Sequence, residues 1–215
     1  QILPWQMIFL IIAIPGLLLG LFMFTLKDPE RREVVKNDQV AEENIGQVFK
    51  YVWSNFSVYF PLLMGSALIV ILLYGVQSWG IEFLTRVHSW ERAEAGRKFG
   101  LMMLISGSIG VISGPILEKY LNKLKVNAAT LIVCLISAIA LTILGPYTFL
   151  ILGSNMVISG LFLIMFFITL PLALFATSLQ NVSPNQYRGV VSGIYVFTAN
   201  IFGLGLGPML VAFFT

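Results

Sequence analysis

Residues 126–187 read VNAATLIVCLISAIALTILGPYTFLILGSNMVISGLFLIMFFITLPLALFATSLQNVSPNQY and contain no Lys, Arg, Asp or Glu. An ionised side chain near the centre of a bilayer is costly, so a chain that repeatedly crosses lipid keeps its charges out of such stretches. A helix needs roughly 20 residues to cross a hydrocarbon core about 30 Å thick. This stretch is therefore long enough for two membrane spans.

The same segregation of charge extends over the whole chain. The hydrophobic share of 58% and the charged share of 11% lie outside the values of about 45–50% and about 25% that are typical of soluble domains. Both observations predict a polytopic membrane protein. The other uncharged stretches are 1–26, 51–81, 99–117 and 189–215, and the charges fall in 27–50, 82–98, 118–125 and at Arg188.

Six spans are predicted. Each of the other four uncharged stretches supplies one span, and residues 126–187 supply two because they divide at Gly145-Pro146-Tyr147. In lipid the backbone must satisfy its own hydrogen bonds, and no alternating pattern typical of barrel strands is present. The predicted fold class is all-α, a transmembrane helical bundle. The predicted spans are 4–26, 56–79, 99–117, 127–145, 150–178 and 189–214.

The distribution of basic residues predicts the orientation, since short cytoplasmic loops are enriched in Lys and Arg. Three alternate connections carry most of these residues, whereas the segment 82–98 on the other side mixes both signs. We expect a multi-pass protein of the cell membrane, plasma or inner. Its cytoplasmic segments would be 27–55, 118–126 and 180–188.

The orientation places Gln1 outside, directly before a span, with no cationic region or cleavage site typical of a signal peptide. We therefore expect a fragment that lacks an odd number of preceding spans.

Cys134 lies within a span, where it is expected to behave as a small buried hydrophobic residue. His88 is expected to be a solvated loop residue rather than a pH sensor. One Cys and one His do not make an ordinary zinc site, so no metal and no cofactor are expected.

The segment 114–123, GPILEKYLNK, ends a span and places an acid and several bases at the membrane edge. It resembles the loop signature of the major facilitator superfamily, in which Gly is followed after three residues by an acid and then by basic residues. In this chain Glu118 replaces the more usual Asp, and the Gly after the basic residue is absent.

Further segments resemble the spinster-like branch of that superfamily over essentially the whole chain. The resemblance implies spans six to eleven, with spans one to five and twelve missing. Residues 1–26 would be the last span of the N-terminal half, 27–55 a cytoplasmic central loop, and 56–215 a C-terminal half bundle of five spans. Residues 5–31 resemble the superfamily's sixth span and the start of its central loop, and the segments that resemble the spinster-like branch are 79–96, 179–189 and 195–208.

Superfamily architecture implies that the spans here called seven, eight, ten and eleven face a central cavity. Polar residues in the predicted seventh and eleventh spans agree with this, because polar groups prefer a bundle interior to lipid. The alternative for each residue is helix-to-helix hydrogen bonding or aromatic core packing. The candidate cavity residues are Tyr74, Gln77, Ser78, Trp79, Phe166, Thr169, Tyr195 and Asn200.

A cytoplasmic gate is the second predicted site. Glu118 would bond a helix N-terminus or pair with an arginine and so latch one conformer closed. Solvated loop charges, worth about 0–1 kcal/mol, are the alternative. Two ridges of small residues, Ser106-Gly110-Gly114 and Gly203-Gly207, are expected to serve close helix packing. The candidate gate residues are Gly114, Glu118, Lys119, Lys123 and Arg188.

The predicted function is alternating-access transport of a small organic or amphipathic solute, with a lysolipid-like substrate implied by the spinster resemblance. A non-transporting receptor or assembly subunit on the same fold is the alternative, since fold alone does not fix function. A membrane-embedded enzyme is less favoured, because no span holds His, Asp or Glu. Expected partners are the substrate, the bilayer and the missing N-terminal half, with no nucleic acid. Glu82 is the one local candidate for proton coupling.

Overall fold

The computed structural model describes residues 3–26, 45–126 and 128–214. The chain divides into two compact units, Gln1–Ala41 and Glu42–Thr215. The described residues form helices and turns without a strand, which confirms the predicted all-α class. Most of the predicted central loop, residues 27–44, and Asn127 lie outside the described residues.

The first unit contains one apolar helix, α1 (Pro4–Met23). A proline in the first turn has a φ that suits a helix and lacks only an N–H that would be unpaired there. The backbone N–H of Leu3 donates to the Gln6 side chain at 2.9 Å. Side chains from Met7 to Met23 are exposed on every side of the helix, as expected of a helix whose surroundings are lipid or other spans.

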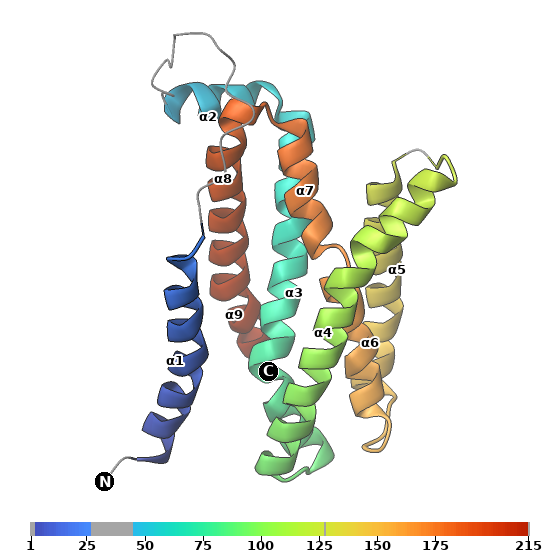
Figure 1. Cartoon of the computed structure of the whole chain (residues 1–215). Helices are drawn as coiled ribbons and strands as arrows, with labels where there is room; N and C mark the ends of the chain where they lie inside the picture. Colours follow the sequence, from blue (N-terminus) through green and yellow to red (C-terminus); the bar gives the residue numbers. More distant parts are fainter. Residues whose placement is uncertain (1–2, 27–44, 127, 215) are drawn as a thin grey trace. The chain divides into compact units, whose positions relative to one another are not determined.

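The second unit is a bundle in which α2 runs crosswise at one end and the later helices run along its length (Figure 1). The helices are α2 (Ile45–Ser54), α3 (Phe56–His88), α4 (Arg92–Lys123), α5 (Ala129–Leu150), α6 (Val157–Thr169), α7 (Leu172–Val182), α8 (Arg188–Asn200) and α9 (Gly207–Phe214). A 3₁₀ turn, Asn185–Tyr187, precedes α8, and a π-helical segment, Ile201–Leu206, joins α8 to α9.

Six segments of the described chain are long and apolar enough to span a membrane, as predicted. Their ends differ from the prediction. The helices α3 and α4 extend to His88 and back to Arg92, so the predicted outer segment 82–98 is mostly helical. Charged side chains mark where lipid ends, but they do not stop a helix from continuing into water.

The division of residues 126–187 was also misplaced. Helix α5 continues through Pro146 to Leu150, because a proline removes only one hydrogen bond and membrane helices tolerate this loss. The connection to α6 instead falls between Ile151 and Met156. A second, unpredicted interruption separates α6 from α7 at Leu170-Pro171, where the proline lacks the N–H that would continue the helix.

Three clusters form the core. The largest joins α3, α4 and α6, and a second joins α2, α3, α7 and α8. The third links α5 to the α6–α7 break through Val133, Leu170 and Leu174. The buried members of the first two are Leu84, Ala95, Phe99, Met102, Val157, Leu161, Ile164, Met165 and Ile168, and Val48, Tyr59, Leu179 and Val191.

Both predicted small-residue ridges lie at close helix contacts. A Cβ at Gly114 would collide with the backbone oxygen of Leu170, and one at Gly110 would collide with Thr169. A Cβ at Gly207 would lie 2.8 Å from the backbone oxygen of Ile71 in α3. These contacts confirm the packing role predicted for the two ridges, because only glycine lets backbones approach so closely.

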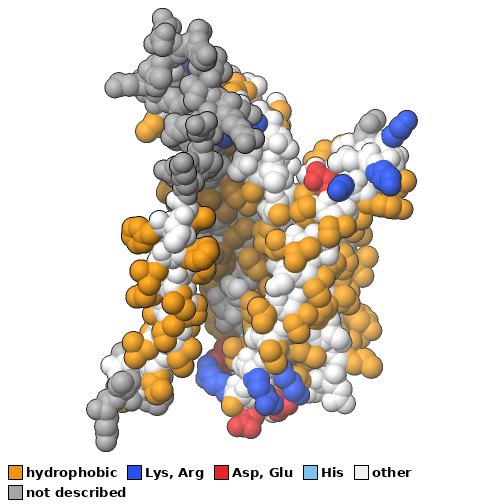
Figure 2. Space-filling view, viewed as in Figure 1, with side chains coloured by type: hydrophobic (Ala, Val, Ile, Leu, Met, Phe, Trp, Pro, Cys, Tyr) orange, Lys and Arg blue, Asp and Glu red, His pale blue; other side chains and the backbone are white. Residues whose placement is uncertain are grey.

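Charged side chains gather at the two ends of the second unit, and hydrophobic side chains cover the face between them (Figure 2). One end, here called the α2 end, carries α2, the α4–α5 connection and the α7–α8 connection. The opposite end carries the α3–α4 and α5–α6 connections. The structure thus groups the connections as the alternation of spans predicts.

Candidate functional site

Helix α3 presents exposed polar side chains at neighbouring positions within a largely apolar stretch. Gln77 and Ser78 are exposed in the second unit, and Tyr74 is half-buried. The Tyr74 ring lies against Gly203 of the π-helical segment, where a Cβ would lie 2.9 Å from its Cδ2 atom. Three of the predicted cavity residues therefore occupy neighbouring positions on α3.

Trp79 lies on a different face of α3, because two residues along a helix correspond to about 200° around its axis. Its indole Nε1 donates to the backbone oxygen of Pro208 at 3.0 Å, which links α3 to α9. The indole also lines an apolar groove of about 520 Å³. The groove is lined by Ile71, Leu72, Gly75, Val76, Trp79, Gly80, Glu82, Phe83, Arg86, Val87, Phe149, Gly207, Leu210 and Val211.

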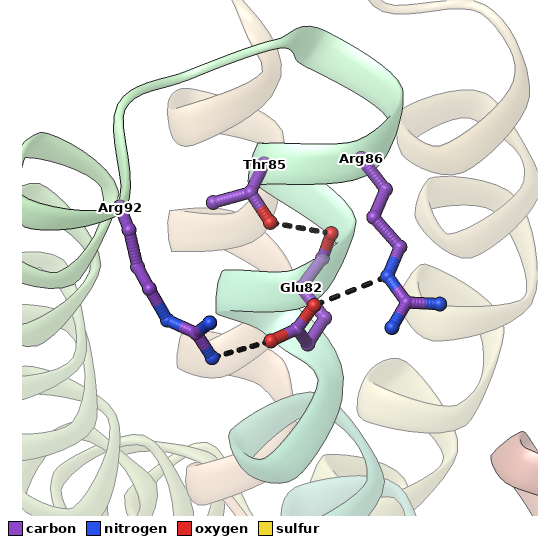
Figure 3. Close-up of polar contacts among 4 residues, drawn as sticks. All are labelled: Glu82, Thr85, Arg86 and Arg92. Atoms are coloured by element: carbon purple, nitrogen blue, oxygen red, sulfur yellow. Dashed lines mark hydrogen bonds and ion pairs between the residues drawn. The ribbon is translucent and has the colours of Figure 1, made fainter.

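Glu82 holds two arginines at the charged end of this groove (Figure 3). Its carboxylate accepts from Arg86 Nε at 3.1 Å and from an Arg92 guanidinium nitrogen at 2.5 Å. The Thr85 hydroxyl donates to the Glu82 backbone oxygen at 3.0 Å. Because Arg92 begins α4, the pair with Glu82 joins α3 to α4 across their short connection.

The remaining predicted cavity residues have contacts of their own in the bundle. Phe166 packs with the cluster of Val133 and Leu170. Thr169 is buried, and its hydroxyl donates to the Met165 backbone oxygen at 2.9 Å. Tyr195 packs against the cluster at the α2 end, and the Asn200 amide donates to Val196 at 2.8 Å within its own helix.

The predicted gate residues lie toward the α2 end. Glu118 accepts a hydrogen bond from the Thr130 hydroxyl in the first turn of α5. This bond ties the end of α4 to the beginning of the next helix. Lys119 and Lys123 are exposed, and Gly114 lies at the helix contact with Leu170.

Arg188 has different partners from Glu118. Its Nε donates to the backbone oxygen of Gln180 at 2.9 Å and also lies 3.4 Å from that of Ser183. The guanidinium thus bonds carbonyl groups at the end of α7, where the last carbonyls of a helix lack partners within it. Glu118 and Arg188 each tie neighbouring segments together in this structure.

Several contacts went unpredicted. The Tyr59 and Ser183 hydroxyls are 2.9 Å apart and link α3 to the end of α7. The Trp90 indole donates to Ser154 at 2.6 Å, and Lys98 Nζ lies 4.7 Å from the centre of the Trp90 ring. The aromatic residues near the span ends were the available signal, because Tyr and Trp there combine an apolar ring with a polar tip.

His88 differs from its predicted solvated state. Its Nε2 is buried without a hydrogen-bond partner among the described residues. The imidazole packs edge-on against Phe83, with ring centres 5.0 Å apart. Helix α3 continues to this residue and so carries it against the bundle. Within the described ranges, no group of three or more His, Cys, Asp or Glu residues could hold a metal ion.

Five spans packed in one bundle, with a further apolar helix in the first unit, define a polytopic helical membrane protein. Residues 1–208 match the family model of the Major Facilitator Superfamily. The chain belongs to this family.

Two crystal structures have a similar fold, both of a bacterial homologue of the human lysosomal transporter Spinster in an inward-facing conformation. The unoccupied form has 20% sequence identity and a TM-score of 0.67, with 95% of this chain and 43% of that chain covered. The occupied form has 19% identity and a TM-score of 0.58, with 95% and 41% covered. The chain thus spans less than half of those proteins. No match was found among curated proteins.

Proposed function

We propose that this chain forms part of a transporter that moves a small organic or amphipathic solute across the membrane by alternating access. Membership of the Major Facilitator Superfamily supports this proposal. So does the likeness to structures of a homologue of a lysosomal transporter. In such folds, two bundles rock against each other around a site near the middle of the membrane.

The exposed pair Gln77 and Ser78 is the observation that supports the proposal most strongly. These residues lie within an apolar span and point away from the core of the second unit. An amide exposed to lipid would be unfavourable, and polar residues within spans usually face a bundle interior or a water-filled cavity. We therefore assign this part of α3 to the solute pathway.

The pathway would also include Tyr74, which borders Gln77 and Ser78 on the same helix. Trp79, Phe166, Thr169, Tyr195 and Asn200 were predicted with them, and we propose that these residues shape the pathway mainly by holding the helices that border it. The apolar character of the bundle suits an amphipathic solute. A lysolipid-like substrate rests on the resemblance to the spinster branch alone.

The α2 end is proposed to be cytoplasmic, because most basic residues outside the mixed segment 82–98 belong to it. Gly114, Glu118, Lys119, Lys123 and Arg188 would then form the cytoplasmic gate region. The bond from Thr130 to Glu118 supports a role for this carboxylate in fixing the α4–α5 turn. In the proposed arrangement, residues 1–26 are the last span of the N-terminal half, and residues 56–215 belong to the C-terminal half.

Uptake by proteoliposomes containing the full-length protein tests the proposed function. A solute library should include lysophospholipids and other amphiphiles. We expect Gln77→Leu to lower uptake of the transported solute about tenfold, because it removes an amide from the pathway. The matched control is Thr142→Ala, which removes an exposed polar group on α5 and should leave uptake within about twofold. Binding without flux for every solute would instead favour the receptor alternative.

A further inference from the structure

Helix α2 has three distinct faces. At about 100° per residue, Ile45, Phe49 and Trp53 fall within one narrow arc. Their side chains are 61%, 56% and 76% exposed. Gln47, Lys50 and Ser54 occupy a separate polar arc and are also exposed. The third arc packs on the bundle.

The packed arc fixes α2 firmly. Val48 is fully buried against Tyr59, Leu179 and Val191. The Tyr51 ring meets the Tyr59 ring edge-on, with centres 6.2 Å apart. The exposed arc is therefore held in a fixed direction and does not belong to a loosely attached helix.

The turn into α3 also fixes the direction of α2. Asn55, the single residue between the two helices, donates from its side-chain amide to the Tyr51 backbone oxygen at 2.9 Å. Its backbone N–H donates to the same oxygen at 3.1 Å. This turn places α2 crosswise to the long axis of α3 (Figure 1).

The exposed apolar arc continues directly into the surface of a membrane span. Trp53 lies 5.4 Å from Phe56 between ring centres, and Phe56 stacks on Phe60 at 4.7 Å. Phe56 and Phe60 are exposed residues in the first turns of α3. An unbroken aromatic surface thus runs from the crosswise helix onto the span.

We infer that α2 lies in the boundary between headgroups and acyl chains of the leaflet at the α2 end. Ile45, Phe49 and Trp53 would enter the upper acyl region, and Lys50 would face anionic phosphates. A helix with an exposed apolar arc, a polar arc that carries a lysine and an aromatic anchor suits this position. Tryptophan prefers the same depth because its ring is amphipathic. The partner is therefore a lipid surface with anionic headgroups.

Depth-dependent quenching of Trp53 tests this inference. In the full-length protein every other tryptophan is replaced by Phe, and the protein is reconstituted into vesicles of phosphatidylcholine brominated at different chain positions. We expect the bromines nearest the headgroup to quench Trp53 at least twice as strongly as those near the chain ends. The matched control carries Trp53→Phe and Gln47→Trp, which moves the probe to the polar arc and should remove the quenching.

A second quenching experiment tests the preference for anionic headgroups. Brominated phosphatidylglycerol should quench Trp53 about twofold to fivefold more than brominated phosphatidylcholine at equal content. Lys50→Glu should abolish this difference and Lys50→Arg should keep it. Equal quenching by both lipids would overturn the anionic preference. If no brominated lipid quenches Trp53, the inferred lipid contact itself is overturned, and protein or water surrounds this side chain instead. Neither result depends on whether the protein transports a solute.

Discussion

At the scale of single residues, glycine has two separate roles along α4. Gly114 faces the backbone oxygen of Leu170, which cannot rotate away, whereas a Cβ at Gly100 would meet nothing within 4 Å. The two positions lie on one helix with the same backbone conformation. They differ in this contact, and Gly114 also precedes Pro115, whose ring disfavours a helical residue with a Cβ before it.

Gly114→Ala should lower the stability of the protein. The added methyl group forces α4 away from the α6–α7 break, and overpacking of this kind typically costs about 1–3 kcal/mol. Gly100→Ala is the matched control and should be neutral or stabilising by up to about 1 kcal/mol, because alanine favours helix. Thermal unfolding in detergent, followed by circular dichroism, measures both. Equal midpoints for the two variants would show that the close contact at Gly114 is relaxed without cost.

Residue-level predictions succeeded where the chemistry was local and failed where it depended on neighbours. The packing role of Gly110 and Gly114 followed from their spacing, since small residues four apart share a helix face. Trp79 was grouped with Gln77 by proximity in sequence, although the two point in different directions around α3. The buried position of His88 Nε2 depended on how far α3 continues, which charge alone does not indicate.

At the scale of elements, the α3–α4 connection is short and joined by an ion pair. Glu82 accepts from both Arg86 and Arg92, yet the arginine side chains are 73% and 78% exposed. Water therefore competes strongly with these contacts. Exposed pairs of this kind usually contribute little to stability.

A double-mutant cycle with Glu82→Gln and Arg92→Gln should give a coupling energy of about 0–1 kcal/mol. The coupling should decrease at high salt, because ions screen exposed charges. The matched control is the pair Glu94 and Lys98, 2.6 Å apart on one helix, for which about 0.3–0.5 kcal/mol is expected. Chemical unfolding of the single and double variants measures both cycles. A coupling above about 2 kcal/mol for Glu82 and Arg92 would show that this pair is shielded from water.

The number of spans was predictable because lipid excludes charge, but the helix ends were not. Pro146 was taken as a break and Pro171 was not, although both are prolines within apolar sequence. Helix α5 continues past Pro146, whereas the chain at Pro171 is also held by the contact between Leu170 and Gly114. The contact between Leu170 and Gly114 comes from tertiary packing, which a local sequence pattern does not predict.

At the scale of the whole molecule, the connections alternate between two ends of the second unit. Asn122 lies at the α2 end and Glu91 at the opposite end, and both are exposed. The basic residues predict that the α2 end faces the cytoplasm. The orientation is therefore testable at single positions.

Labelling of single cysteines in whole cells tests the orientation of the full-length protein. In a background that has Cys134→Ser and no other cysteine, a membrane-impermeant maleimide should label Glu91→Cys in intact cells. It should label Asn122→Cys only after the cells are permeabilised. The reverse pattern would show that the orientation inferred from basic residues is wrong.

The hydroxyl groups in the interior of the second unit bond mostly within their own helices. Ser66 donates to Leu63 at 2.7 Å, Ser106 to Met102 at 2.6 Å and Thr169 to Met165 at 2.9 Å. These bonds satisfy the hydroxyl groups without a partner on a neighbouring helix. Contacts such as those of Trp90 with Ser154 and of Thr130 with Glu118, near opposite ends of the bundle, supply directional bonds between segments. Near its ends the bundle thus carries directional bonds between segments, in addition to the close glycine contacts that fit α4 against the α6–α7 break.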